Sequence, residues 1–221
     1  MGEVTPLIAG RAFFPGGCGV YHGVTQSALP ARPLMLFGQD FDTVAGYQAA
    51  CKAGHESDSP TWRGIEAIFR AHKIDPAACF YTNVLMGARY ADSNNGPSSA
   101  LADAAFVERC VAAACRQIEI LRPSVVVALG VVSSVLLGTR VCGKKMRCPT
   151  AAQWSGVDAA ELQFIEARSW PELNAPPFAF ASSLHPCMWQ SNTKYRSWVG
   201  LHGREAHDAI WRRVSAALKE A

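Results

Sequence analysis

Three polar residues that could act together stand at the ends of separate apolar runs. Asp40 follows a run that ends at Gly38, Asn83 closes a second run, and His185 follows a third. A carboxylate and an imidazole can orient water and move or stabilise charge during a reaction, and an amide can both donate and accept hydrogen bonds. If the fold brings them together, these residue types could bind a polar ligand and promote a reaction on it.

The apolar runs have the pattern of buried strands in a parallel sheet. Residues 125–129 are continuously apolar, which is typical of a central strand covered by helices on both faces. Segments with helical spacing alternate with these runs, so we expect a single α/β domain with a central, mostly parallel sheet and helices on both faces. The predicted strands are residues 34–37, 79–84, 124–129 and 178–182, and the predicted helices lie within 44–52, 60–74, 101–121, 131–137 and 198–218.

The positions of the three polar residues fit the way in which such sheets bind ligands. Ligands of open α/β sheets lie beyond the carboxyl ends of the strands, and Gly38-Gln39-Asp40, Asn83 and His185-Pro186 each stand at such an end. We therefore expect them to converge on one cleft. Residues 1–33 are rich in Gly and Pro and carry no clear period, so we expect an irregular N-terminal arm on a domain that spans residues 1–221.

Composition narrows the class of protein. The chain has 221 residues, of which 49% are hydrophobic and 18% charged, and these proportions are typical of a folded domain. The N-terminus lacks the pattern of a signal peptide, and no apolar run has the length of a membrane span, so we expect a soluble, cytoplasmic protein with no membrane association. The eight cysteines stand mostly within apolar helix or strand patterns, which indicates reduced thiols.

Basic residues gather at two places, although the net charge is only +3. Arg140, Lys144, Lys145 and Arg147 form one group without an acid, and Lys194-Tyr195-Arg196 follows His185 closely. Both segments are candidate phosphate-contact loops, because basic clusters bind polyanions. The alternative is that both are ordinary solvated surfaces.

These elements, in this order, resemble the uracil-DNA glycosylase superfamily. Gly38-Gln39-Asp40-Phe41-Asp42 is similar to its Gly-Gln-Asp-Pro-Tyr loop, Tyr81-Thr82-Asn83-Val84 to its strand-closing Asn, and His185-Pro186-Cys187-Met188-Trp189 to its His-Pro-Ser loop. The segment from Gln117 through Gly130 is similar to a helix-strand unit of the iron-sulfur branch of the superfamily. The resemblance covers residues from about 34 to 196, and it implies excision of uracil from DNA.

The resemblance gives Asp40 and His185 the catalytic roles. Cleavage of an N-glycosidic bond leaves positive charge on the sugar and negative charge on the departing base. Asp40 would offset the positive charge and orient or deprotonate water, and His185 would donate a hydrogen bond to the base carbonyl oxygen as a neutral imidazole. The alternatives are a loop Asp that caps the next helix and a structural His before Pro.

The resemblance also implies residues that bind the base and the DNA. Gln39 and Asn83 would bind the edge of a base rotated out of the helix, and Trp62 would stack on it, with Phe41 and Tyr47 as rivals. Met188 or Trp189 would fill the space that the base leaves, unless both pack inward. The predicted DNA-binding residues are Cys187, Met188, Trp189, Lys194, Arg196, Lys144 and Lys145.

The sequence departs from the superfamily at several points. Asp42 replaces a Tyr that excludes the thymine methyl group, and Cys187 replaces the Ser of the His-Pro-Ser motif. Four cysteines hold the cluster of the iron-sulfur branch, but Cys18 stands alone near the N-terminus and Gly87 occupies a ligand position, although Cys110 matches another. We therefore predict no iron-sulfur cluster. We also predict no metal or other cofactor, and we expect a monomer.

Two other functions fit the same residues. The substitutions at Asp42 and Cys187 favour a protein that binds lesions or abasic sites in DNA with little or no catalysis. The third hypothesis is a nucleotide-binding α/β module without a role on DNA, but the sequence has no glycine-rich phosphate loop that would support it.

Overall fold

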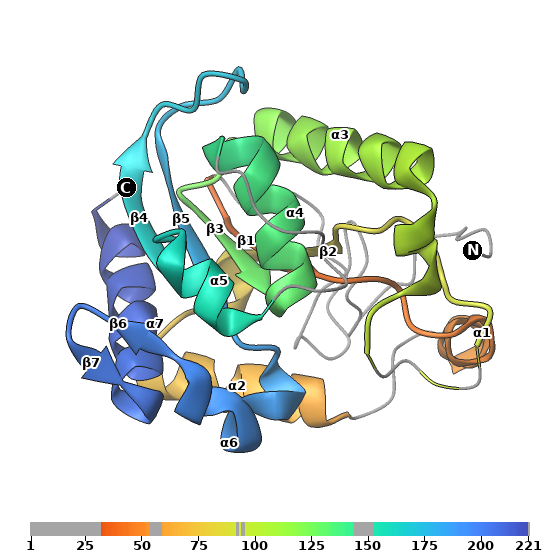
Figure 1. The fold of residues 1–221 in the computed structure, drawn as a ribbon, viewed down its shortest axis with the longest axis horizontal. Coiled ribbons are helices and arrows are strands. Elements are labelled where there is room, and N and C mark those ends of the chain that lie inside the picture. Colours follow the sequence, from red (N-terminus) through yellow and green to blue (C-terminus); the bar gives the residue numbers. More distant parts are fainter. Residues whose placement is uncertain (1–31, 54–58, 92, 94–95, 144–152, 221) are drawn as a thin grey trace.

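Five strands form the central sheet of the protein, in the order β2-β1-β3-β5-β4 (Figure 1). The computed structural model describes residues 32–53, 59–91, 93, 96–143 and 153–220. Four of the strands are parallel, and β4 pairs with β5 in the antiparallel direction. The strands are β1 (Leu34–Gly38), β2 (Cys79–Asn83), β3 (Val125–Leu129), β4 (Phe164–Arg168) and β5 (Phe178–Ser183). The prediction of an α/β domain with a mostly parallel sheet is confirmed.

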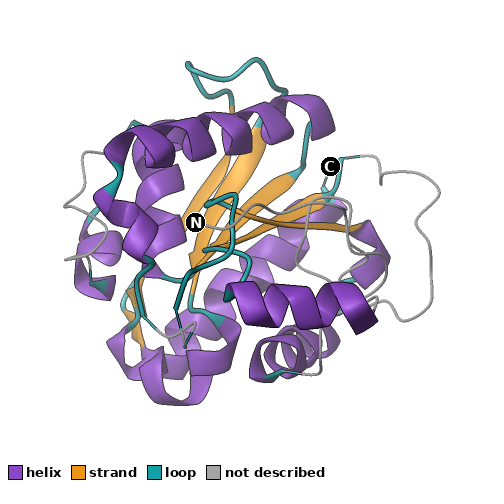
Figure 2. Cartoon of the chain, turned by 90° about the vertical axis from the view of Figure 1, so that its right-hand side faces the viewer, coloured by secondary structure: helices purple, strands orange, loops and turns teal. Residues whose placement is uncertain are grey.

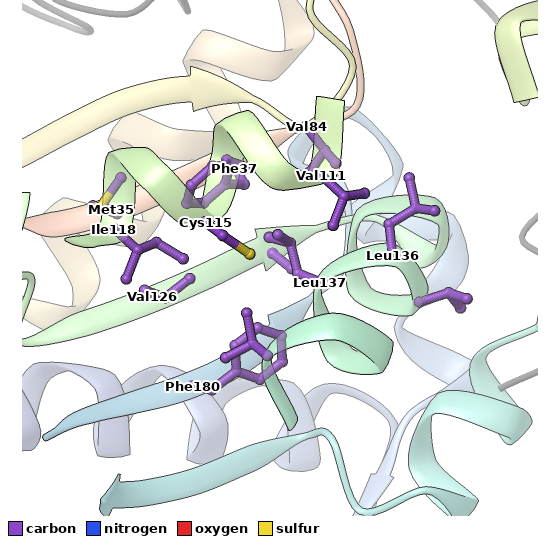
Figure 3. Packing of buried hydrophobic residues seen from close by; sticks show 14 of the residues in the cluster. Met35, Phe37, Val84, Val111, Cys115, Ile118, Val126, Leu136, Leu137 and Phe180 are labelled. Carbon is purple, nitrogen blue, oxygen red and sulfur yellow. The ribbon is translucent and has the colours of Figure 1, made fainter. Parts of the chain in front are cut away.

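Helices cover both faces of this sheet (Figure 2). The longer helices are α1 (Val44–Ala53), α2 (Pro60–His72), α3 (Ala104–Leu121), α4 (Val131–Cys142) and α7 (Gly203–Lys219). Met35 and Phe37 of β1 pack in the core under α3 and α4, while Leu34 and Leu36 pack in the core under α2 and α7. Successive residues of a strand point to opposite faces, which explains the alternation. Figure 3 shows the first of these two cores.

Short elements connect the larger ones. The short helices and turns of 3₁₀ helix are η1 (Pro76–Ala78), η2 (Ser99–Ala102), α5 (Trp154–Ala159), η4 (Pro186–Met188), α6 (Trp189–Asn192) and η5 (Thr193–Tyr195). A small antiparallel hairpin of β6 (Ser197–Trp198) and β7 (Leu201–His202) precedes α7. The predicted terminal helix was therefore placed too early, because residues 197–202 form this hairpin and α7 begins only at Gly203.

Local capping explains where α2 and α3 begin. The Ser59 hydroxyl accepts a hydrogen bond from the Trp62 N–H at 3.3 Å, with Pro60 in the first turn. The Asp103 carboxylate accepts from the Phe106 N–H at 2.9 Å, so α3 begins at Ala104 and not at Leu101. The preceding residues form η2 instead.

One further expectation was wrong, and one strand was missed. The predicted helix end at Gly138 lies inside α4, which continues to Cys142. Gly138 lies there because a Cβ atom would collide with the Leu162 side chain, and Gly143, at φ 65°, is the true C-cap. The sequence also gave no signal for β4, because only Phe164 of this edge strand is buried and the strand lacks a long apolar run.

Candidate active site at the carboxyl ends of the strands

The loops that follow β1 and β2 continue side by side beyond the sheet. The Val84 N–H donates to the Gly38 carbonyl oxygen at 3.0 Å, and the Leu85 N–H donates to the Gln39 carbonyl oxygen at 2.8 Å. Farther along, the Arg89 N–H donates to the Asp42 carbonyl oxygen at 2.7 Å. These backbone bonds fix the segment around Asp40 against the segment that carries Arg89.

Asp40 forms a buried ion pair with Arg89. The Arg89 Nε atom lies 2.6 Å from Asp40 Oδ2, and the two side chains are 6% and 5% exposed. The Gln39 amide donates to the same carboxylate oxygen at 3.3 Å. The Ser98 side chain also hydrogen-bonds to the Asp40 carboxylate. Burial raises the pKa of Asp40, while Arg89 and these hydrogen bonds act in the opposite direction by favouring the charged form.

His185 lies within the electrostatic field of the same guanidinium. Burial, together with the positive charge of Arg89, lowers the pKa of the His185 imidazole to about 4, so the ring is neutral at pH 7. Gly130, at φ 87°, passes so close that a Cβ atom there would lie 3.6 Å from His185 Cβ. The charge of Arg89 therefore acts on both the Asp40 carboxylate after β1 and the His185 imidazole after β5.

Asn83 and Gln39 belong to the same end of the sheet. Asn83 is the last residue of β2 and is paired in register with Gly38 of β1. Its side chain is buried. The Gln39 amide, besides its bond to Asp40, donates to the Gly96 carbonyl oxygen at 3.3 Å. The structure thus brings Gln39, Asp40 and Asn83 together at adjacent strand ends.

The Cys187 thiol contacts His185. Its Sγ atom lies 3.0 Å from His185 Nδ1, although the residue as a whole is exposed. Burial of the sulfur raises the pKa of the thiol, while a hydrogen bond from Thr61 acts to lower it. A protonated thiol can donate to Nδ1, which would leave the ring proton on Nε2. The residue predicted to contact DNA is therefore placed to orient the imidazole.

The predicted stacking role of Trp62 is wrong. Its side chain is 1% exposed and lies in the core under α2 and α7, with its ring centroid 5.7 Å from that of Tyr81. The structure supports the alternative that this tryptophan is a core residue. Its rivals Phe41 and Tyr47 are also buried, in a small separate cluster with Ala50 and Ala88. Phe41 directly follows Asp40, and its contact with a base stays a prediction.

The two bulky residues of the His185 loop have different environments. Met188 is exposed, and its role as a wedge in DNA stays a prediction. Trp189 packs inward, because its ring lies edge-on against His207 at 4.6 Å and its Nε1 donates to the Leu184 carbonyl oxygen at 3.3 Å. This packing fits the alternative that Trp189 packs inward, and its contact with DNA stays a prediction.

The structure also separates the predicted phosphate contacts. Lys194 is exposed and lies over the Tyr195 ring. Arg196, in contrast, is buried: its guanidinium pairs with Asp158 at 3.2 Å, donates to the Ser182 carbonyl oxygen at 3.0 Å and lies 4.2 Å from the centre of the Trp154 ring. The prediction that Arg196 binds phosphate is therefore wrong. Lys144 and Lys145 lie outside the described residues.

Arg89 is the main functional residue that the sequence did not reveal. It is the one basic residue in the sequence between Lys73 and Arg109, in the segment that follows Asn83. That isolation was a signal, but nothing local shows that its partner is Asp40. Ser98, which also hydrogen-bonds to Asp40, is a second residue that the sequence did not reveal.

No family model matches the sequence, and no curated protein matches it. Within the described ranges, no helix is long and apolar enough to cross a membrane, and no three His, Cys, Asp or Glu side chains group as metal ligands would. The Cys110 sulfur accepts a hydrogen bond from the Met86 N–H, and Cys18 lies outside those ranges.

Proposed function

We propose that the protein hydrolyses the N-glycosidic bond of a damaged base in DNA, with uracil as its first substrate, and so acts in base excision repair. One observation carries the proposal: Asp40 pairs with the buried Arg89 guanidinium at the carboxyl ends of parallel strands, and the charge of that guanidinium also acts on His185 from a distant part of the chain. That edge is where such sheets bind ligands. The resemblance in the motifs around these residues supports the same reaction.

The proposed mechanism divides two opposite tasks between the two residues. As the bond between the sugar C1′ and the base breaks, its electron pair leaves with the base, and the Asp40 carboxylate offsets the positive charge on the sugar. Water oriented by Asp40 then adds to C1′ and transfers a proton to the Asp40 carboxylate, and the released base anion takes up a proton from solvent. The neutral His185 ring donates a hydrogen bond to the carbonyl oxygen of the departing base. The Asn83 amide, beside Asp40 at the strand ends, would read the edge of the base.

Release of uracil from oligonucleotides tests this proposal. The purified chain is incubated without added metal or cofactor with single-stranded and double-stranded DNA that contains one uracil, and abasic sites are scored by alkaline cleavage. Asp40→Asn and His185→Ala should each slow release by about 10²-fold or more. Asp208→Asn, in a partly exposed pair with Arg204, and His202→Ala, at an exposed residue, are the matched controls and should keep the wild-type rate. Wild-type rates from both site variants would rule out the mechanism.

The ion pair itself favours a second candidate function. Because the Asp40 carboxylate already contacts Arg89 at 2.6 Å, it is less available to act on water than a free carboxylate. A protein of this kind would bind DNA at a lesion or an abasic site and cleave slowly or not at all. Binding to DNA with an abasic analogue, measured beside uracil release, separates the two: tight binding without release supports the second candidate.

A further inference from the structure

Backbone hydrogen bonds hold Arg89 in place in addition to its ion pair with Asp40. The backbone N–H of Arg89 donates to the Asp42 carbonyl oxygen at 2.7 Å, and the backbone carbonyl oxygen of Arg89 accepts from the Val44 N–H at 2.9 Å. The loops after β1 and β2 are therefore already joined by backbone hydrogen bonds, and this join does not depend on the Arg89 side chain. A buried guanidinium also costs several kcal/mol of desolvation unless it is well paired. A charge kept here at such a cost calls for a role beyond holding the loops.

The surroundings of this guanidinium contain both proposed catalytic groups. Beside it lies the Asp40 carboxylate, which is also contacted by the neutral side chains of Gln39 and Ser98. The charge of the guanidinium also acts on His185, whose ring contacts the Cys187 thiol. Among the described residues, Arg89 is the charged group that acts on both. A positive charge in this place favours an ionised carboxylate and disfavours an ionised imidazole.

We propose that Arg89 is the positioning residue that prepares the site: its buried guanidinium holds the Asp40 carboxylate in one orientation, and its positive charge acts on both proposed catalytic groups. The inference rests on the proposed function and deepens it. The Arg89 cation thus favours a charged Asp40 for the sugar, and it adds to burial, the larger cause, in favouring an uncharged His185 for the base. Arg89 acts through these two residues, and the mechanism needs no contact between Arg89 and DNA.

The direction of the expected pH effect follows from the two charge states. Without the guanidinium, the pKa of Asp40 rises because its charged form loses a partner, and the pKa of His185 rises because its charged form is no longer repelled. The active form has an ionised Asp40 and a neutral His185, so both changes move the acidic limb of the pH–rate profile to higher pH. A purely structural role for Arg89 would lower the rate or the stability without moving this limb.

The experiment compares Arg89→Met, Arg89→Lys and Arg213→Met in the full chain. Arg213 pairs with Glu166 at the surface and is the matched control. The first measurement is the pH dependence of single-turnover uracil release, and the second is the NMR titration of the His185 ring, assigned by comparison with His185→Gln. Arg89→Met should move the acidic limb and the His185 titration to higher pH and slow release at pH 6 by roughly 10-fold or more. Arg89→Lys, which keeps the charge but not the planar fork, should slow release while leaving the His185 titration near its wild-type position.

The outcomes separate the inference from the proposed function. If the wild type releases no uracil, the proposed function fails, and the NMR titration still tests whether Arg89 controls His185. If the wild type is active but Arg89→Met keeps the pH limb and the titration of Arg213→Met, the inference is overturned even when Arg89→Met is slow. Should Arg89→Met not fold, the double variant Asp40→Asn with Arg89→Met removes both charges of the pair, and its His185 titration should still move upward.

Discussion

The described residues include two buried Arg–Asp pairs, and they differ in what surrounds them. The Arg196–Asp158 pair lies beside β5. Its guanidinium donates to the Ser182 carbonyl oxygen and lies over the Trp154 ring, and its carboxylate accepts a hydrogen bond from the Ser197 N–H. The Arg89–Asp40 pair lies at the carboxyl ends of the strands beside a neutral imidazole. The same chemical pair is thus part of the packing in one place and of a candidate active site in the other. The surroundings of each pair distinguish them, because Ser182 also stands near the carboxyl end of β5.

The largest expected difference between the two pairs is at their carboxylates, Asp40 and Asp158. Asp40→Asn should reduce uracil release by about 10²- to 10³-fold, because the variant loses the negative charge that faces the sugar. Its folding free energy should change less than that of an Asp158→Asn variant, since Asp158 also fixes the Ser197 backbone. Single-turnover release and urea unfolding of both variants measure the contrast. An Asp40→Asn protein that unfolds and still cleaves would reverse the assignment of the two pairs.

Arg196→Met should act on stability and not on DNA. Removal of one partner leaves the Asp158 carboxylate buried and unpaired, which costs about 3–5 kcal/mol. Replacement of both partners by apolar residues should recover much of this loss. Chemical denaturation measures the stability, and the salt dependence of DNA binding by the folded variant should equal that of the wild type. A reduced salt dependence would restore Arg196 as a phosphate contact.

A third test uses pH at the histidine that packs behind β5. Burial, with the charge of Arg196 second, lowers the pKa of His207 to about 3, and its Nε2 atom lies 3.2 Å from Ser183 Oγ. The unfolded chain binds a proton near the ordinary value of about 6.5, so stability is complete above that pH and falls as the pH drops toward 3. The slope from this group is at most about 1.4 kcal/mol per pH unit.

The matched variants for this pH test are His207→Gln and His202→Gln. His207→Gln should lose the slope of one proton in urea unfolding between pH 6 and 4, because the glutamine does not titrate there. His202 is exposed, and its replacement should leave the slope as it is. Equal slopes in all three proteins would mean that His207 is not buried in its neutral form.

The same comparison shows how far the sequence could lead. The strands that end at Gly38 and Asn83 were predictable because short apolar runs end in residues that break strands, and the position of Asp40 follows from them. The roles of Arg89 and Arg196 were not predictable. Each is decided by a carboxylate far away in the chain, at Asp40 or Asp158, and local pattern carries no information about such a partner. A basic residue near a motif is therefore weak evidence for a phosphate contact.

The smallest expected effect is at Lys194, which is exposed, in contrast to the buried Arg196. Lys194 is exposed beside the His185 loop, so Lys194→Ala should weaken binding to any DNA sequence by a few-fold. The plot of log affinity against log salt should become shallower by about 1, because one fewer counterion is released. Stability should stay within about 0.5 kcal/mol of the wild type, as for most surface substitutions. If the slope is unchanged, DNA does not pass over this loop, and the basic surface of the protein must be sought elsewhere.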